Sequence, residues 1–231
     1  MKNLCMALAA MALISCSCSV NIGGNGKHVV CKGPVVMKQL DIDMNLTDFN
    51  SIRINGSADL KYVQDKEGFG VQVEANEEVF QYLNYYVEDG TLVLETKDNV
   101  EIRAKEYDVY VASPTLVNVE VNGALDATII AIEQEEDLTI VVNGASDCEL
   151  QNIHVPTLTF TINGASDLDA IGLDVENLCV NVNGAGDVDL AGKAGKASLN
   201  VAGAGDIDAR NLECSNIDKS QSGLASIRTR R

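Results

Sequence analysis

VVNGASDCEL, residues 141–150, holds the short pattern that decides the fold. An Asn-Gly pair follows apolar residues, and an aspartate stands three residues after the glycine. Close variants recur along the chain as INGSADL (54–60), VNGALDA (121–127), INGASDL (162–168), VNGAGDV (182–188) and VAGAGDI (201–207). From Gly123 to a weaker copy at Gly223, the glycines follow one another at intervals of 21, 20, 20, 19 and 20 residues. A fixed period near twenty residues is typical of a solenoid, in which each repeat forms one coil stacked on the next.

Apolar and polar residues alternate on both sides of the Asn-Gly pair. In one repeat, Leu138, Ile140 and Val142 precede the pair, and Cys148 and Leu150 follow it. A period of two indicates strands with one buried face, and no repeat shows the period of a helix. Stacked coils place like strands over like strands, so the sequence predicts an all-β parallel β-helix with about 20 residues per coil.

The Asn-Gly pair itself is expected to bend each coil. Asparagine tolerates a left-handed backbone and glycine adopts one freely, so the pair turns the chain without strain. Stacking would also place the asparagines about 4.8 Å apart, where amide side chains can form a ladder of hydrogen bonds. The predicted turn ladder consists of Asn122, Asn143, Asn163 and Asn183, with Gly123, Gly144, Gly164, Gly184 and Gly203.

Both ends of the repeat region depart from the pattern. The 67 residues from Gly56 to Gly123 have the length of roughly three coils but lack the motif, so an irregular part is expected over 36–115. Within it, the residues from Glu77 to Leu83 form the best helical candidate, and Asp89-Gly90 suggests a hairpin turn. Regular repeats are expected over 116–228, and the last one places polar residues in apolar columns, which protects an exposed sheet edge.

The N-terminus predicts an exported protein. Lys2 precedes an apolar run at 4–14, too short to span a bilayer, and small residues follow it. The run ends in Leu-Ile-Ser-Cys, which resembles a bacterial lipobox and makes Cys16 the predicted site of lipidation; an ordinary signal peptide is the alternative. We therefore expect a signal peptide over 1–15, a flexible tether over 16–35 and one β-solenoid domain over 36–231. The lipid would anchor the domain to the outer membrane, on a face that the sequence leaves open.

Charge and cysteine usage limit the partners. The formal charge of −17 disfavours nucleic acid and favours cations or basic partners. Seven cysteines include Cys5 in the signal peptide and Cys16, which leaves an odd number without a CxxC pair. Zinc is disfavoured because histidines are few, and Cys148 is predicted to be a buried free thiol.

The repeats, the lipobox and an F-x-x-I-x-I-x-G segment at 49–56 together resemble one family. It is the putative auto-transporter adhesin head GIN domain family of bacterial exported proteins. The resemblance covers about residues 40–228 and includes VEDGTLVLET (87–96). Family members usually carry Gly-Ser-Gly-Asp where this chain has Asn-Gly-Ala-Ser-Asp. The resemblance implies a right-handed β-helix similar to pectin-lyase folds, without an established catalytic site, and a role in adhesion.

The aspartates of the motif form a predicted column, in which two charges about 4.8 Å apart repel by about 0.9 kcal/mol in water. Either each carboxylate accepts N–H groups of its own turn, or a divalent cation bridges the coils. A twenty-residue period differs from the nine-residue period of calcium-binding solenoids, so no cofactor is expected and calcium is the alternative. The candidate cation ligands are Asp126, Asp147, Asp167, Asp187 and Asp206.

Catalysis is disfavoured, because a residue repeated in every coil serves the repeat rather than one active site, and no nucleophile motif is present. Tyr82, Tyr85 and Tyr86 form an aromatic cluster that either caps the core or contacts a glycan. The sequence thus predicts a non-catalytic adhesion or binding module, with glycan or an envelope or host protein as partner. A structural component of the envelope is the alternative, and a polysaccharide-active enzyme is the weaker one.

Overall fold

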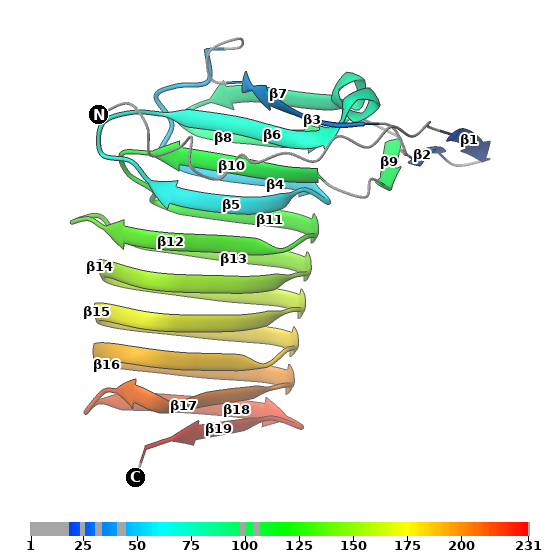
Figure 1. The fold of residues 1–231 in the computed structure, drawn as a ribbon. Helices are drawn as coiled ribbons and strands as arrows, with labels where there is room; N and C mark the ends of the chain where they lie inside the picture. The colour runs from blue at the N-terminus through cyan, green and yellow to red at the C-terminus, as the bar shows by residue number, and fades with distance from the viewer. Residues whose placement is uncertain are drawn as a thin grey trace.

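The computed structural model describes residues 19–23, 26–30, 34–40, 45–97, 100–103 and 107–230. These residues form a β-solenoid of about six turns of roughly 20 residues. Figure 1 shows the coils stacked along one axis, from the N-terminal part at the top to the C-terminus at the bottom. The predicted parallel β-helix is confirmed. The predicted signal peptide and Cys16 lie outside the described residues.

The repeats stack in the register that their letters predict. Strands β13 (Leu138–Ala145), β14 (Asp147–Ala165), β15 (Asp167–Ala185) and β16 (Val188–Ala204) pair in parallel. Their glycines pair directly, Gly144 with Gly164 and Gly184 with Gly203. Strands β14 and β15 each run through almost a whole coil, so each repeat contacts mainly the one before and the one after it.

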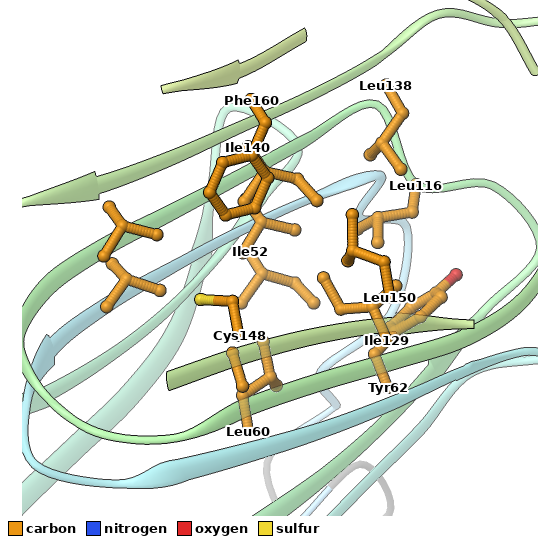
Figure 2. Close-up of a cluster of buried hydrophobic side chains, with 14 of the residues drawn as sticks. Ile52, Leu60, Tyr62, Leu116, Ile129, Leu138, Ile140, Cys148, Leu150 and Phe160 are labelled. Carbon is orange, nitrogen blue, oxygen red and sulfur yellow. The ribbon is translucent and has the colours of Figure 1, made fainter. Parts of the chain in front are cut away.

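Inward-facing residues of successive coils fill the interior. Ile52, Ile140 and Phe160 belong to one column of paired residues, and all three are fully buried. Figure 2 shows them stacked, with Leu60 and Cys148 on the opposite side of the coil. This core is mostly aliphatic, as the alternating pattern predicts.

The first copy of the motif stacks directly on the second. Strands β4 (Ser51–Gly56) and β5 (Asp59–Gln64) pair in parallel with β11 (Asn118–Ala124) and β12 (Ala127–Glu133). The regular stack therefore begins near residue 51, not near 116. The intervening residues do not form three coils: the chain leaves the stack after β5 and returns at β11 to pair with the coil that it left.

Residues 65–116 form what we call the N-terminal cap. In the cap, β8 (Thr91–Thr96) pairs in parallel with β4 and β10 (Tyr107–Ser113) with β5, which continues both sheets by one strand. Antiparallel strands then close the ends of these sheets. Strand β7 (Leu83–Glu88) pairs with β8 at the end of one sheet. At the end of the other, β6 (Gly70–Asn76) pairs with β10, and β3 (Val35–Gln39) pairs with β6. Antiparallel partners end the solenoid because their direction is incompatible with another coil.

Two local predictions in the cap are confirmed. Residues Glu77–Tyr82 form a 3-10 helix, η2, at the helical candidate. Asp89 and Gly90, with φ of 49° and 73°, form the turn between β7 and β8. Positive φ at both central residues is typical of a two-residue hairpin loop.

Paired strands also lie inside the segment predicted to be a flexible tether. Strands β1 (Ser19–Gly23) and β2 (Gly26–Val30) form a hairpin, and β2 pairs with β9 (Val100–Arg103). These backbone stretches are hydrogen-bonded to each other where the sequence suggested an irregular chain.

The last coil is polar. It consists of β18 (Ile217–Gly223) and β19 (Ser226–Thr229), which pair with β16 and with β17 (Asp206–Glu213) of the coil above. Lys219 and Gln221 take the columns of Leu199 and Val201, and the Lys219 ammonium donates to Thr229 Oγ1 at 2.9 Å. A charged side chain in an apolar column prevents a further apolar coil from stacking below.

The predicted role of the Asn-Gly pair is confirmed for the glycine and wrong for the asparagine: the strands break directly after the pair, between Ala145 and Asp147 in one repeat. The glycines have φ between +143° and +156°, but none of the four ladder asparagines has a positive φ. A second bend, with a left-handed backbone, lies at Ala131, Asn152 and Gly172, which occupy equivalent positions in three coils, with φ of 57°, 56° and 72°. Glycine is needed in the motif because a Cβ at Gly144 would overlap the carbonyl oxygen of Gly123.

Candidate functional site

The asparagines of the motif join successive coils by side-chain hydrogen bonds. Asn143 Nδ2 donates to Asn122 Oδ1 at 2.8 Å, Asn163 to Asn143 at 2.8 Å, and Asn183 to Asn163 at 3.0 Å. Asn122 donates in turn to Asn55 at 2.9 Å, so the ladder includes the first copy of the motif. Asn122 donates its second N–H to Glu120 at 3.0 Å, whereas Asn143, Asn163 and Asn183 each keep one N–H for solvent or a ligand.

The serine and the aspartate of the motif bind backbone N–H groups of neighbouring coils. The Ser166 hydroxyl, which is buried, accepts the N–H of Ser146 at 3.0 Å. The Asp167 carboxylate accepts the N–H of Asp187 at 2.8 Å, and the Asp187 carboxylate that of Asp206 at 3.2 Å. The predicted donors within the aspartate's own turn are therefore replaced by donors of the next coil. Stacking itself explains why the motif recurs.

A second acidic file lies two residues after the motif aspartates. Strand register places Glu149, Asp169, Asp189 and Asp208 beside one another, parallel to the file of motif aspartates. The two files line an open groove of about 420 Å³, which we call the acidic groove. Its rims and floor are formed by Asp126, Ala127, Thr128, Asp147, Cys148, Glu149, Asp167, Leu168, Asp169, Asp187 and Asp189.

Cations neutralise this face near both of its ends. At the N-terminal end Lys61, which is the strand partner of Thr128 in the groove, pairs with Asp108 at 2.7 Å. At the C-terminal end Arg228 pairs with Asp206 at 2.8 Å, and Arg210 pairs with Asp208, whose pKa it lowers to about 2. Near the N-terminal end, burial raises the pKa of Asp59. Within the described residues, no Lys, Arg or His side chain pairs with the motif aspartates of the central coils. The central groove thus keeps a strong negative field.

The acidic groove lacks the convergence that a metal site requires. Across the described residues, no three His, Cys, Asp or Glu side chains are placed to hold one ion. The files are linear, so each carboxylate faces solvent beside its neighbours rather than across a shared centre. Calcium binding at the five predicted aspartates stays a prediction.

The aromatic cluster is divided between the interior and the surface. Tyr85 is buried in the core and its pKa is raised by that burial, whereas Tyr86 is 37% exposed. Tyr82 packs against the core in part. Successive residues of a strand face opposite sides, so the three tyrosines do not form one surface. Only Tyr86 is available as an exposed aromatic platform.

The described cysteines are free thiols. Cys148 is buried, as predicted, and burial raises its pKa to about 12. Cys179 and Cys214 are half-buried. Among the described residues, no helix has the length and apolar character needed to cross a bilayer.

Family comparison identifies the chain. Residues 48–230 match the family described as putative auto-transporter adhesin, head GIN domain, and the chain belongs to that family. No curated protein matches the sequence.

Solved structures share the fold at low sequence identity. A putative lipid binding protein from Parabacteroides distasonis ATCC 8503 has a TM-score of 0.72 at 19% identity, over 88% of this chain and 100% of that one. A putative adhesin from the same organism has a TM-score of 0.68 at 20% identity, over 87% and 84%. A putative adhesin from Bacteroides fragilis NCTC 9343 has a TM-score of 0.66 at 18% identity, over 84% and 96%. At such identities the likeness shows the fold alone.

Proposed function

We propose, from its membership of the head GIN domain family, that this chain is a non-catalytic adhesion module of the bacterial cell envelope. The family and the similar structures are described as putative adhesins or, in one case, as a putative lipid binding protein. In this proposal a lipid on Cys16 holds the mature protein at the outer membrane, and the solenoid presents its outward faces to a ligand.

One observation carries the proposal: outward side chains of the same type recur in register over successive coils. Such files form long, rigid surfaces whose chemistry is repeated along the axis. A polymer with a repeating structure can contact such a surface at several coils at once, which raises its overall affinity. A catalytic site instead requires different groups converging on one reacting atom.

The experiment is a binding screen with the mature lipoprotein in detergent micelles, against a glycan array and against envelope and host-cell surface extracts. We expect retention of at least one ligand that leaves the protein chemically unchanged. Retention of nothing on the array, together with crosslinking only to envelope proteins, would favour a structural component of the envelope. Shortening of a bound polysaccharide would show an enzyme and contradict the proposal.

Lipidation is tested separately in cells. Labelled fatty acid should enter the wild-type protein and be absent from the Cys16→Ser variant, while Cys18→Ser serves as the matched control. Equal labelling of wild type and Cys16→Ser would remove the anchor from the proposal without affecting the binding module.

A further inference from the structure

The sheet that carries the asparagine ladder has an uncharged outward face. Its outward positions belong to β13, β14, β15 and β16, in the stretches that precede and include the Asn-Gly pairs. We call this face the polar sheet: Thr139, Val141, Asn143, Thr159, Thr161, Asn163, Cys179, Asn181, Asn183, Ser198, Asn200 and Ala202. The chain has a net charge of −17, and the same coils carry the acidic groove on another face. Charge is therefore sorted between two faces of the same coils.

The polar sheet offers ordered hydrogen-bonding groups that the protein leaves unused. The hydroxyls of Thr139, Thr159 and Thr161 make no hydrogen bond to any described residue. Asn200 donates to Asn181 at 3.0 Å, which forms a second, shorter amide ladder beside the first. Asn200 uses its second N–H on Ser198 at 3.3 Å, whereas Asn143, Asn163 and Asn183 each keep one N–H that no described residue accepts. Because strands fix their spacing at about 4.8 Å, these groups are preorganised for a ligand.

One file of this face leads to the exposed aromatic ring. Register places Asn181, Thr161 and Val141 in line with Glu120 and Arg53 of the coils nearer the cap. The same file continues through Val93 of β8, which is buried, to the exposed Tyr86 of β7, and directly opposed residues project from the same face. From Tyr86 to Asn200 the file crosses seven strand spacings, or about 34 Å.

The two charged residues in this file, Arg53 and Glu120, neutralise each other. Arg53 Nε donates to Glu120 at 2.8 Å, and hydrogen bonding to Glu120 raises the pKa of the guanidinium. Below them, the central file holds only Val141, Thr161, Asn181 and Asn200. The file itself thus carries no net charge from Arg53 to Asn200. At the ring, Glu88 of β7 and Glu95 of β8 project from the same face beside Tyr86, so that end of the path is acidic.

We propose that the polar sheet and Tyr86 bind an uncharged polysaccharide laid along the solenoid axis. A sugar ring stacks on Tyr86, and hydroxyls of the following sugars exchange hydrogen bonds with the threonines and with the free amide groups. This inference rests on the proposed function and specifies its ligand.

Charge selects this ligand among the alternatives. An anionic polymer is repelled by a chain with a charge of −17, and a cationic one is drawn to the acidic groove. A protein partner prefers an interface core rich in aromatic and apolar side chains, of which the polar sheet contains few. An uncharged polyol matches a neutral face whose free groups are hydroxyls and amides.

The test is affinity electrophoresis of the mature lipoprotein in detergent, through gels that contain one soluble polysaccharide each. The uncharged probes are a glucan, a mannan and a xylan, and the anionic probes are polygalacturonate and alginate. We expect at least one uncharged probe to retard the protein. Tyr86→Ala should weaken that retardation about tenfold, because stacking of an aromatic ring is lost, and Tyr86→Phe should retain it.

A matched pair of threonine variants locates the site. Thr161→Arg places a large cation in the polar sheet and should abolish retardation, whereas Thr128→Arg makes the same change in the acidic groove and should leave it intact. Thermal melting must show that all variants keep their fold; if Thr161→Arg unfolds, Asn181→Arg replaces it.

The outcomes separate this inference from the proposed function. Retardation by anionic probes alone, or binding of protein ligands alone, overturns the inference and leaves the adhesion module standing. Equal retardation of wild type and Thr161→Arg also overturns it. Self-association that Thr161→Arg abolishes would assign the polar sheet to a second copy of the chain. Shortening of the polysaccharide would contradict the proposed function itself.

Discussion

The regular stack and the N-terminal cap achieve stability in different ways. In the stack, each residue meets an equivalent residue above and below, so one residue type serves the same contact in several coils. In the cap, each contact occurs once: Tyr62 of the first coil donates to the Ser113 carbonyl at 3.1 Å, and the rings of Phe49 and Phe69 lie 5.1 Å apart. The stack therefore depends on contacts and close backbone approaches that are repeated from coil to coil, and the cap on contacts that each occur once.

Matched glycine substitutions should show the largest difference between the two regions. In the stack, Gly144→Ala forces a Cβ into the Gly123 carbonyl, which should cost about 4 kcal/mol or more in the free energy of unfolding. In the cap, Gly90→Ala meets only Asn50 Oδ1, at 3.7 Å, so only the left-handed backbone opposes it, at about 1–2 kcal/mol. Urea denaturation measures both. Equal losses would contradict the role assigned to the motif glycines.

Aromatic truncation should produce the next largest difference. Phe160 is fully buried in the stack, so Phe160→Ala should destabilise the protein by about 3–5 kcal/mol through the cavity that it leaves. Phe80 is only partly buried in the cap, beneath the Lys38 ammonium at 4.2 Å. Phe80→Ala should therefore cost about 1 kcal/mol. The midpoints of urea unfolding of the two variants measure this difference. A larger loss of stability in Phe80→Ala than in Phe160→Ala would place the main core in the cap.

Alkaline pH should act through the cap and the coil beneath it. Burial raises the pKa of Tyr62 and of Tyr107 to about 12, whereas tyrosine in the unfolded chain ionises near pH 10. The stability that these neutral hydroxyls provide is complete below about pH 10 and is lost as the pH rises toward 12. We expect the thermal midpoint to fall over that window, and to fall less in a Tyr62→Phe, Tyr107→Phe double variant.

A buried thiol in the stack provides the comparison. The pKa of Cys148 is raised to about 12, so its contribution also declines as the pH rises above about 9. Cys148→Ala should flatten the early part of the same pH profile. If the double tyrosine variant follows the wild-type curve, the hydroxyls do not govern alkaline unfolding.

Breaking the amide ladder should have the smallest effect. Asn163→Ala removes two hydrogen bonds from the middle of the ladder, and Asn55→Ala removes one from its end. At about 1 kcal/mol net for each hydrogen bond, the first substitution should cost roughly twice the second. Chemical denaturation resolves the difference. Equal costs would indicate that the ladder bonds are not separate contributions.

The stack could be predicted from the sequence because its order is local and repeated. Period and alternation are visible in the letters, so register between coils follows once one pair is aligned. The second bend could not be predicted, because Ala131, Asn152 and Gly172 share a backbone conformation but no side-chain chemistry. The positive φ of the motif glycines was predicted, but the close approach between coils that also requires glycine there is invisible in a single repeat.

The cap could not be predicted because its pairings are long-range and occur once. The shared motif relates residue 56 to residue 123, but nothing in the sequence shows that the residues between them leave the stack, or that antiparallel strands close the sheets. The candidate site was predicted in part. The acidic file follows from the period, but the second file and the link from Thr161 to Tyr86 require strand register across the cap.

The bend at Gly172 lies where one coil is shorter than its neighbour, and it bears on how the length of the solenoid can change. The coil that contains the 19-residue interval is one residue shorter there, between Ala170 and Leu173, yet the pairing resumes in register on both sides. Each unit meets only its two neighbours, so duplication or loss of a whole unit would alter the reach of the molecule by about 4.8 Å while both ends keep their own contacts. The length of the solenoid can therefore change by one coil at a time without a change in the fold of the remaining coils.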